Sequence, residues 1–278
     1  MPFIDVEKSI EDGRPVKLYA FSIGSVTWRY TSADETITAL GHEWEPAAIS
    51  DDGIKQTGET QNDAMTINAP SWIGPCQLFM SAAPSKAVQV SIFQKHEGLA
   101  ETVAVYVGEI TQVNYPVPGS GRITCETLAS TMRREGLRLG WQRTCPYSLY
   151  DPLTCKVSKS AWGVTFVVLS VDGFTVQVEL AAGRVGGFFN GGFAEWAHPV
   201  RGAEFLPIET HSVSSGAPVA ATLMLFTDPG DLYPGATGTL YPGCSFTPAS
   251  CQSFGNYDNY GGVPDLPGKS PFDGSPVF

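Results

Sequence analysis

The chain has 278 residues, of which 42% are hydrophobic and 16% charged, the balance of a soluble globular protein with room for two small domains. Its formal net charge of −11 argues against general affinity for nucleic acid or for anionic membrane surfaces, although an acidic surface also serves solubility alone. Residues 1–12 lack the apolar core of a secretory signal, and no apolar run approaches the roughly 20 residues of a spanning helix. We therefore expect a protein made in a cytoplasm, without stable membrane association.

The N-terminal half predicts a succession of short strands. The segment VKLYAFSIG, residues 16–24, alternates as a strand does when one face lies toward a core. Further strands are predicted at 28–31, 35–40, 64–68, 87–94, 103–111 and 122–127. Because turn residues separate these strands and long periodic helices are missing, the pattern favours an antiparallel barrel or sandwich. We predict an all-β, mainly antiparallel fold whose first β-barrel domain spans residues 1–140.

The clearest hairpin signal lies in the second half. Asp172 and Gly173 separate the apolar runs 162–171 and 174–180, and Asp-Gly is typical of a tight primed turn. Two more strands are predicted at 204–212 and 219–226. The sequence therefore predicts a connecting loop over 141–160, a second β-barrel domain over 161–230, and a Gly/Pro-rich C-terminal tail over 231–278.

Four of the six cysteines form two pairs on loops rich in turn formers. Nine residues separate Cys145 from Cys155, and six separate Cys244 from Cys251. The tail from Cys244 onward is too poor in aliphatic residues to build a core, so a cross-link, a metal or a partner must hold it. The two pairs predict one four-ligand centre that joins the middle loop to the tail.

Three kinds of cross-link are compatible with these pairs. An iron-sulfur cluster accounts for four thiolates on irregular loops. Zinc also accepts four thiolates, but its structural sites usually use tighter Cys-x2-Cys spacings. Disulfides would require late oxidation, because a cytoplasm keeps thiols reduced. On spacing alone the iron-sulfur cluster and zinc agree about equally well with the cysteine pattern, and disulfides agree less well.

The other two cysteines stand apart from these pairs. Cys76 lies in a predicted short helix and Cys125 in an alternating run, so we expect both to be small buried hydrophobes.

A short basic stretch precedes Cys145. TMRREGLRLGWQR places Arg133, Arg134, Arg138 and Arg143 close together in an acidic chain. A solvated turn explains them, and so does compensation of an anionic thiolate centre. Nucleic-acid binding is a poor third, because no aromatic residues interleave the arginines.

The sequence carries no complete catalytic motif that we recognise. His42 and His96 each begin a His-Glu pair without the second histidine of a zinc-hydrolase helix, so we expect ordinary loop or surface histidines. A Cys-His hydrolase would need a thiol near His198 or His211. We predict that the protein is not an enzyme.

Three segments carry a resemblance to a known family. FFNGGFAEW, GDLYPGATGTLYPGCSFTPASC and FGNYDNYGGVPDLPG follow one another in this order. They resemble the tail-tip or baseplate hub proteins of long-tailed, non-contractile bacteriophages and gene transfer agents, a family that includes the tail tip protein L of lambda-like phages. The resemblance covers most of the chain and is most specific from Arg143 to Pro271.

The resemblance implies a cofactor and its ligands. In this family four cysteines hold an iron-sulfur cluster, and they match Cys145, Cys155, Cys244 and Cys251. We therefore expect an iron-sulfur cluster, of the 4Fe-4S type, with zinc as the alternative. The sequence NYGG at 259–262 stands where the family usually has Asn-Phe-Gly-Gly.

The family also implies a place in a virion. Its members form a ring, generally a trimer, between the distal tail protein and the central tip or fibre protein, with the tape measure protein as a further expected partner. Two hub-type barrels per chain in a homotrimer would continue a sixfold tail tube, and DNA would only pass through the lumen. We expect the cluster to act as a staple that closes a loop of about ninety residues.

Two other classes of function stay open on the sequence. A carbohydrate-binding β protein would use Tyr257 and Tyr260 for sugar contacts, although these rings would equally pack around the cysteines. A tail-associated cell-wall hydrolase is the enzymatic alternative.

Overall fold

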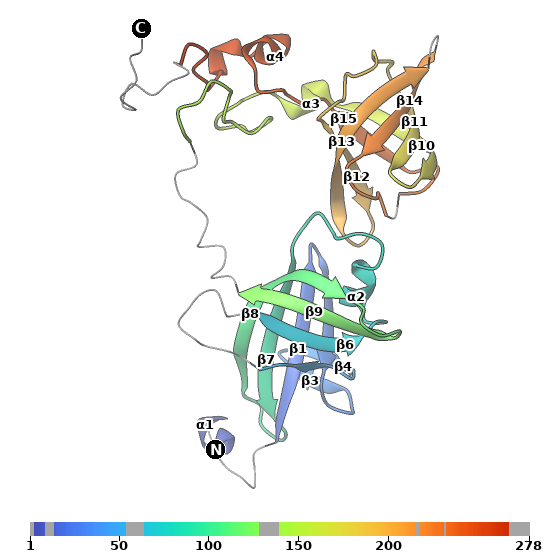
Figure 1. Ribbon diagram of the computed structural model, residues 1–278. Helices are drawn as coiled ribbons and strands as arrows, with labels where there is room; N and C mark the ends of the chain where they lie inside the picture. Colours follow the sequence, from blue (N-terminus) through green and yellow to red (C-terminus); the bar gives the residue numbers. More distant parts are fainter. Residues whose placement is uncertain are drawn as a thin grey trace. The chain divides into compact units, whose positions relative to one another are not determined.

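The computed structural model describes residues 3–8, 14–53, 64–127, 139–214, 217–230 and 232–266. The chain divides into two compact units, residues 1–134 with 198–204 and residues 135–197 with 205–278. Both units are built mainly of β-strands (Figure 1), and antiparallel pairs dominate them. The predicted all-β, mainly antiparallel fold class is therefore confirmed. None of the helices in the described ranges has the length and apolar character of a membrane span.

The first unit is a nine-stranded sheet with the order β3-β4-β2-β1-β7-β8-β9-β6-β5. Its strands are β1 (Pro15–Ile23), β2 (Val26–Thr31), β3 (Ile37–Ala39), β4 (His42–Pro46), β5 (Ser50–Asp51), β6 (Met65–Pro70), β7 (Val88–His96), β8 (Thr102–Asn114) and β9 (Ser120–Thr127). Two short helices, α1 (Phe3–Glu7) and α2 (Gly74–Leu78), accompany the sheet. β2 and β4 pair in parallel, whereas β1 pairs antiparallel with both β2 and β7.

The strand order of the first unit differs from the barrel that we predicted. Among the described strands the order ends at β3 and at β5, and no pairing joins the two ends. Side chains draw β5 toward β1 instead. Asp51 of β5 accepts hydrogen bonds from Lys17 Nζ at 2.6 and 2.8 Å and from the Tyr19 hydroxyl at 2.6 Å. Because β5 is only two residues long, it offers too little backbone to close the sheet by pairing.

Strand β1 packs on both of its faces, although its alternation predicted only one. Tyr19 and Phe21 belong to the main core of the unit. Leu18 is also fully buried, in a second small core with Ala39 and Trp44 of the β3–β4 hairpin. The prediction was wrong here because a later hairpin covers the face that the local pattern left to solvent.

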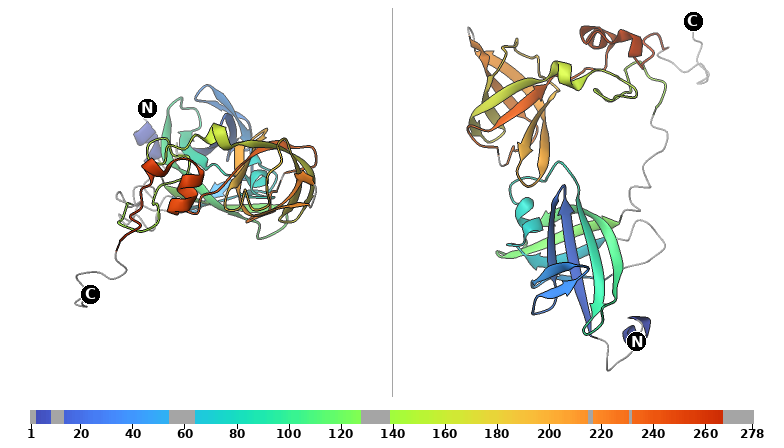
Figure 2. Two further views of the ribbon diagram at one scale, coloured as in Figure 1. Left: turned by 90° about the horizontal axis from the view of Figure 1, so that it is seen from above. Right: turned by 180° about the vertical axis from the view of Figure 1, so that it is seen from behind.

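The second unit is a closed barrel of six strands with the order β10-β11-β14-β13-β12-β15. The strands are β10 (Val164–Asp172), β11 (Thr175–Leu180), β12 (Phe193–His198), β13 (Gly202–Ser214), β14 (Ala217–Leu225) and β15 (Thr237–Tyr241). Figure 2 shows the ring of strands from above and the same barrel from behind. The predicted Asp172–Gly173 hairpin is confirmed, and Gly173 has the positive φ of 56° that a primed turn requires.

The pattern did not predict β12 or β15. β15 pairs with β10 and β12 and so closes the barrel, although it lies in the segment 231–278 that we expected to form the tail. Gly238 interrupts the apolar pattern of β15 for a steric reason. A Cβ at this position would lie 2.5 Å from the Glu195 carbonyl oxygen and 2.7 Å from the Phe166 ring. The barrel therefore needs glycine where a typical strand signal would have a β-branched residue.

The two cysteines outside the pairs behave as predicted. Cys76 on α2 and Cys125 on β9 are fully buried in the main core of the first unit. Burial raises the pKa of the Cys76 thiol to about 11 and that of Cys125, together with the nearby charge of Asp52, to about 12. Both thiols therefore stay protonated at neutral pH.

The two histidines of the first unit differ from each other. His42 is exposed on β4, as expected of a surface histidine. His96, at the end of β7, is only 1% exposed, and its Nε2 lies 2.6 Å from Glu7 Oε2. The expectation of a surface position was wrong for His96 because α1 packs against β7.

Candidate functional site

The four paired cysteines line one small cavity in the second unit. Cys145 and Cys155 come from the loop before α3 (Lys159–Trp162), Cys244 follows β15, and Cys251 lies on α4 (Pro248–Ser253). In Figure 1 the red α4 lies beside the green loop that carries the first pair. The remaining lining residues are Tyr147, Leu149, Phe246, Thr247, Asn259 and Tyr260. The structure thus brings together the four thiols that the sequence predicts to share a centre.

Backbone hydrogen bonds hold the two cysteine-bearing segments side by side. The Cys145 amide donates to the Phe246 carbonyl at 2.9 Å, and the Val263 amide donates to the Gln142 carbonyl at 2.9 Å. These bonds are independent of any cofactor, and they join segments that are about a hundred residues apart in the chain. The protein itself therefore builds part of the cross-link that we predicted for the tail.

The two glycines of the NYGG sequence are required by close packing. A Cβ at Gly261 would lie 2.3 Å from the Tyr147 ring. A Cβ at Gly262 would lie 2.6 Å from the Arg143 carbonyl oxygen and 2.8 Å from the carbonyl carbon of Thr144. Only glycine lets the tail approach the loop before Cys145 so closely.

The sulfur atoms meet several hydrogen-bonding groups. Cys244 Sγ accepts from the Phe246 amide at 3.3 Å and lies 3.4 Å from the Ser250 hydroxyl, which donates to it. Cys251 Sγ donates to the Asn256 carbonyl at 3.1 Å. Donors aimed at sulfur stabilise a thiolate and tune thiolate-bound cofactors. The environment of Cys244 is therefore suited to a ligating sulfur.

The four thiols oppose one another's ionisation. Burial raises the pKa of Cys251, and the neighbouring Cys145, Cys155 and Cys244 raise it further. Ionising all four would gather negative charge in one half-buried cavity, which is unfavourable unless a cation lies among the sulfurs. The donor set is thus chemically suited to a cationic, sulfur-loving metal centre.

The size of the cavity limits what the present arrangement holds. The space between the side chains is about 20 Å³, close to the room of one water-sized sphere. Across the described ranges, no three His, Cys, Asp or Glu side chains are placed to hold a metal ion as they stand. A cluster of several metal atoms would need more room between the four sulfur atoms.

Aromatic packing attaches the cysteine centre to the barrel. The Tyr150 ring makes edge contacts with Phe193 of β12, Tyr241 of β15 and Phe254 after α4, with centroid distances of 6.2, 6.1 and 6.4 Å. Its hydroxyl donates to the Pro242 carbonyl at 2.8 Å. Movement of the cysteine loops would therefore disturb the end of the barrel formed by β12 and β15.

Three residues near the cysteines adopt an unfavourable backbone conformation. Tyr150, Lys156 and Phe246 have φ values of 66°, 60° and 58°, in a backbone region that residues other than glycine rarely adopt. Each such residue costs about 1–3 kcal/mol and persists only where its surroundings determine it. The cysteine loops are therefore strongly constrained.

The basic stretch before Cys145 is described only in part. Arg133, Arg134 and Arg138 lie outside the described residues, so their compensation of the cysteine centre stays a prediction. Arg143 is exposed, and its Nε donates to the Leu266 carbonyl at 2.8 Å. Arg143 therefore helps to hold the tail.

The two tyrosines considered for sugar contacts stack on each other. The Tyr257 and Tyr260 ring centroids lie 6.0 Å apart with an angle of 14° between the planes. The Tyr260 hydroxyl donates to the Arg143 carbonyl at 2.7 Å and lies 3.2 Å from the Phe246 carbonyl oxygen. Tyr260 thus serves the cysteine centre, whereas Tyr257 keeps 47% of its surface exposed.

The histidines considered for a Cys-His hydrolase do not line the cysteine cavity. His198 Nδ1 accepts from the amides of Val200 and Arg201 at 3.1 Å. His211 is buried in the barrel against the Phe189 ring, at a centroid distance of 5.0 Å. The described lining of the cavity contains no histidine, so the structure does not assemble that catalytic pair there.

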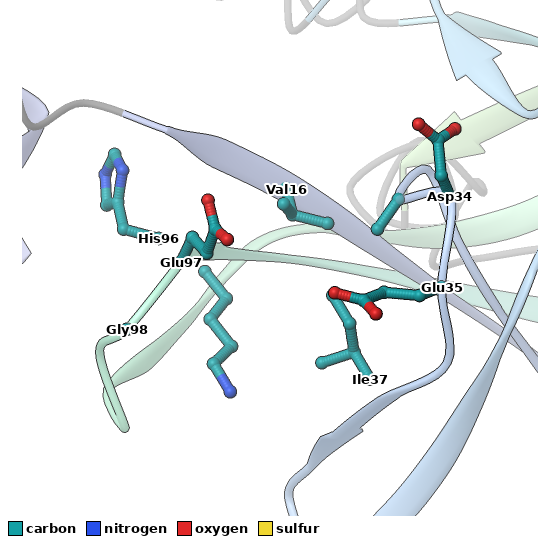
Figure 3. Close-up of a pocket in the computed structure, with 9 residues that line it drawn as sticks. Val16, Asp34, Glu35, Ile37, His96, Glu97 and Gly98 are labelled. Atoms are coloured by element: carbon teal, nitrogen blue, oxygen red, sulfur yellow. The ribbon is translucent and has the colours of Figure 1, made fainter.

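A larger cavity lies in the first unit, and no sequence pattern predicted it. Its volume is about 480 Å³, and its lining includes Val16, Glu35, Ile37, Lys95 and Glu97. Figure 3 shows Glu35 directed toward the end of β7, where Glu97 lies. The lining combines apolar groups with charges of both signs, so it indicates no particular ligand.

Comparisons with known proteins point to phage-related proteins. Residues 187–270 match the profile of a family described as "Phage conserved hypothetical protein BR0599". An uncharacterized protein of Xylella fastidiosa (strain 9a5c) is 33% identical over 75 residues, which is 27% of this chain and 16% of that protein. The chain thus matches about one sixth of the length of that curated relative.

One solved structure shares nearly the whole fold. A chain described as "Virion of native gene transfer agent (GTA) particle" superposes with a TM-score of 0.77, covering 95% of this chain and 96% of its own length. The sequence identity is 15%, so this similarity concerns the fold. Both units are therefore parts of an architecture that a gene transfer agent particle also contains.

Proposed function

We propose that this chain is a structural virion protein of a phage-type tail tip or baseplate. In this proposal it forms a homotrimeric hub ring between the distal tail protein and the central tip or fibre protein, and it has no catalytic role. The observation that carries the proposal is the fold shared over 95% of the chain with a gene transfer agent virion chain. The match of residues 187–270 to a phage-conserved family supports it.

The architecture is suited to a ring. Each chain contributes one closed barrel and one sheet with a main core of its own, so a trimer contributes six β units. Six units of similar size could continue a tail tube with sixfold symmetry. The net charge of −11 would let DNA pass a lumen without adhering to it.

We further propose that Cys145, Cys155, Cys244 and Cys251 hold an iron-sulfur cluster, of the 4Fe-4S type, that staples the tail to the middle loop. Such a cluster supplies strong iron-thiolate bonds and so converts binding free energy into folding free energy. The convergence of four thiols on one cavity supports this proposal, and so do the two donors that face Cys244 Sγ.

Anaerobic purification of the full chain tests the cofactor. Iron, acid-labile sulfide and zinc would be assayed on one sample together with its visible spectrum. Brown protein with about four iron and four sulfide per chain is expected for a 4Fe-4S centre. Zinc without sulfide would replace the cluster by a zinc staple, and protein that binds neither metal would refute the staple.

Assembly tests the place in the virion. Particles would be produced with the wild-type chain, with Cys251→Ser, and with Ser253→Ala as a control on the same helix. We expect labelled antibody against the wild-type chain to bind the tail tip, and Cys251→Ser alone to lower the yield of intact tails. Antibody binding elsewhere on the particle would refute the hub position. Intact, infectious Cys251→Ser particles would reject the staple.

Two simple assays separate the alternative functions. A glycan array tests sugar binding, and clearing of peptidoglycan tests hydrolysis. We expect neither activity, and a specific positive result in either would contradict the purely structural role.

A further inference from the structure

We infer that Asn256 is the positioning residue of the cysteine centre and gathers thiols from both segments before any cofactor binds. The inference rests on the proposal that this centre takes a thiolate-bound metal cofactor. Asn256 itself lies outside the set of four cysteines, in the turn between α4 and the short 3-10 helix η2 (Tyr257–Asn259).

Asn256 contacts both cysteine pairs at once. Its side-chain Nδ2 donates to the Cys155 carbonyl and lies 3.8 Å from Cys155 Sγ. Its backbone carbonyl accepts from Cys251 Sγ at 3.1 Å, and its amide donates to the Cys251 carbonyl at 3.1 Å. Asn256 therefore joins a cysteine of the middle loop, 101 positions before it in the chain, to a cysteine of the tail.

A second asparagine orients the Asn256 amide. Asn259 Nδ2 donates to Asn256 Oδ1 at 2.8 Å, so the oxygen of Asn256 is engaged and its nitrogen faces Cys155. An amide is suited to this place because it both accepts and donates, whereas a carboxylate at the same place would only accept. A carboxylate would also add a negative charge beside sulfurs that must become thiolates.

The cysteines that Asn256 contacts are the two most buried of the four, so loss of the contact would change their exposure to solvent most. Cys155 and Cys251 are each 9% exposed, whereas Cys145 and Cys244 are half-buried. Opening the tail would release the two buried sulfurs into solvent. Removal of the Asn256 side chain breaks its bond to Cys155 and leaves the backbone bonds to Cys251 in place. Cys155 should therefore gain reactivity directly, and Cys251 through the opening of the tail.

The test measures thiol reactivity in the metal-free full chain. Alkylation by iodoacetamide would be followed at each cysteine by mass spectrometry in the wild type, Asn256→Ala and Asn256→Asp. We expect the rates at Cys155 and Cys251 to rise about tenfold in both variants, since a lost hydrogen bond of this kind favours local opening by about that factor. Wild-type rates at both cysteines in both variants would overturn the inference.

Two references keep the result interpretable. Asn114→Ala removes an asparagine with a comparable hydrogen bond, 2.9 Å from Gln112 Nε2 on β8, and should leave all rates unchanged. Cys76 and Cys125 are fully buried in the first unit and report its unfolding, and the thermal unfolding curve of each variant reports the second unit. If Cys76 and Cys125 react in Asn256→Ala, the rates in the more conservative Asn256→Asp decide whether Asn256 positions the cysteines.

Cofactor uptake separates this inference from the proposed function. If the wild type binds iron and Asn256→Ala binds at least several-fold less under the same limiting supply, both stand. If the wild type binds no metal while the variants still expose Cys155, the cofactor proposal fails and the positioning role remains. If the wild type binds iron and the variants match it in rates and uptake, only the positioning role fails.

Discussion

Replacing Cys155 by serine should cost the second unit much of the stability that a staple provides. A cross-link between Cys155 and Cys244 would close a loop of about ninety residues, which in the chain-entropy model stabilises by roughly 4–5 kcal/mol. This loop contains strands β10 to β15 and hence the whole barrel. For a unit of about 140 residues, such a loss lowers the unfolding midpoint by roughly 10–20 °C.

Thermal unfolding of the full chain under anaerobic conditions would measure this loss. Cofactor-loaded wild type and Cys155→Ser would be compared first, and the same two proteins would then be compared after removal of the metal by a chelator. Because serine is close in size to cysteine, the two metal-free proteins should differ by less than about 1 kcal/mol. The stabilisation that the staple provides is therefore the difference between the two comparisons, as in a double-mutant cycle.

Two results would refute the reasoning. Equal midpoints for the loaded wild type and Cys155→Ser would mean that Cys155 contributes nothing to the staple. An equally large loss in the metal-free pair would mean that Cys155 stabilises through packing alone.

Three further predictions concern single sites. Asp51→Asn should destabilise the first unit by about 2–3 kcal/mol in urea at pH 7, because Lys17 loses its buried counter-ion. Burial raises the pKa of Asp51, but hydrogen bonds from Lys17, Tyr19 and Gly53 outweigh it and leave the pKa below 3.8. The stability that ionised Asp51 contributes is thus present above pH 4 and lost as the pH falls through the lowered pKa. If Asp51→Asn lost stability in acid as steeply as the wild type, this assignment would be contradicted. Burial lowers the pKa of His211, so its protonation favours unfolding and the stability of the barrel falls as the pH drops below about 6.5. In His211→Leu the urea midpoint should therefore change less between pH 7 and pH 5 than in the wild type. The same change with pH in both proteins would count against this. Gly262→Ala should accelerate proteolysis of the tail severalfold, because its Cβ would clash with the Arg143 carbonyl oxygen. Gly140→Ala should leave the rate unchanged, because its Cβ would meet open space; equal rates for Gly262→Ala and wild type would exclude the steric argument.

Local sequence patterns were sufficient to predict the parts of the fold that depend on residues close together in the sequence. The alternation around residues 103–111 and the Asp172–Gly173 turn produced strands and a hairpin where they were predicted. The burial of Cys76 and Cys125 also followed from their local surroundings. In each case the residues that fix the conformation lie within a few positions of one another.

The cysteine centre was predictable in part. The two pairs, in segments with little else to bury, indicated that Cys145, Cys155, Cys244 and Cys251 would meet. The role of Asn256 was not indicated, because its contacts with Cys155 and Cys251 exist only once the tail lies against the middle loop.

By itself the sequence determined the all-β class, most strands, and the four thiols that share a cavity. Only the tertiary structure decided how each unit closes: by β15 in the barrel, where Gly238 admits the Phe166 ring, and by Asp51 binding Lys17 in the curled sheet. The physical reason is the same in both units. Closure depends on matching shape and charge between residues that are distant in the chain, and a local sequence pattern does not specify which distant residues will contact it.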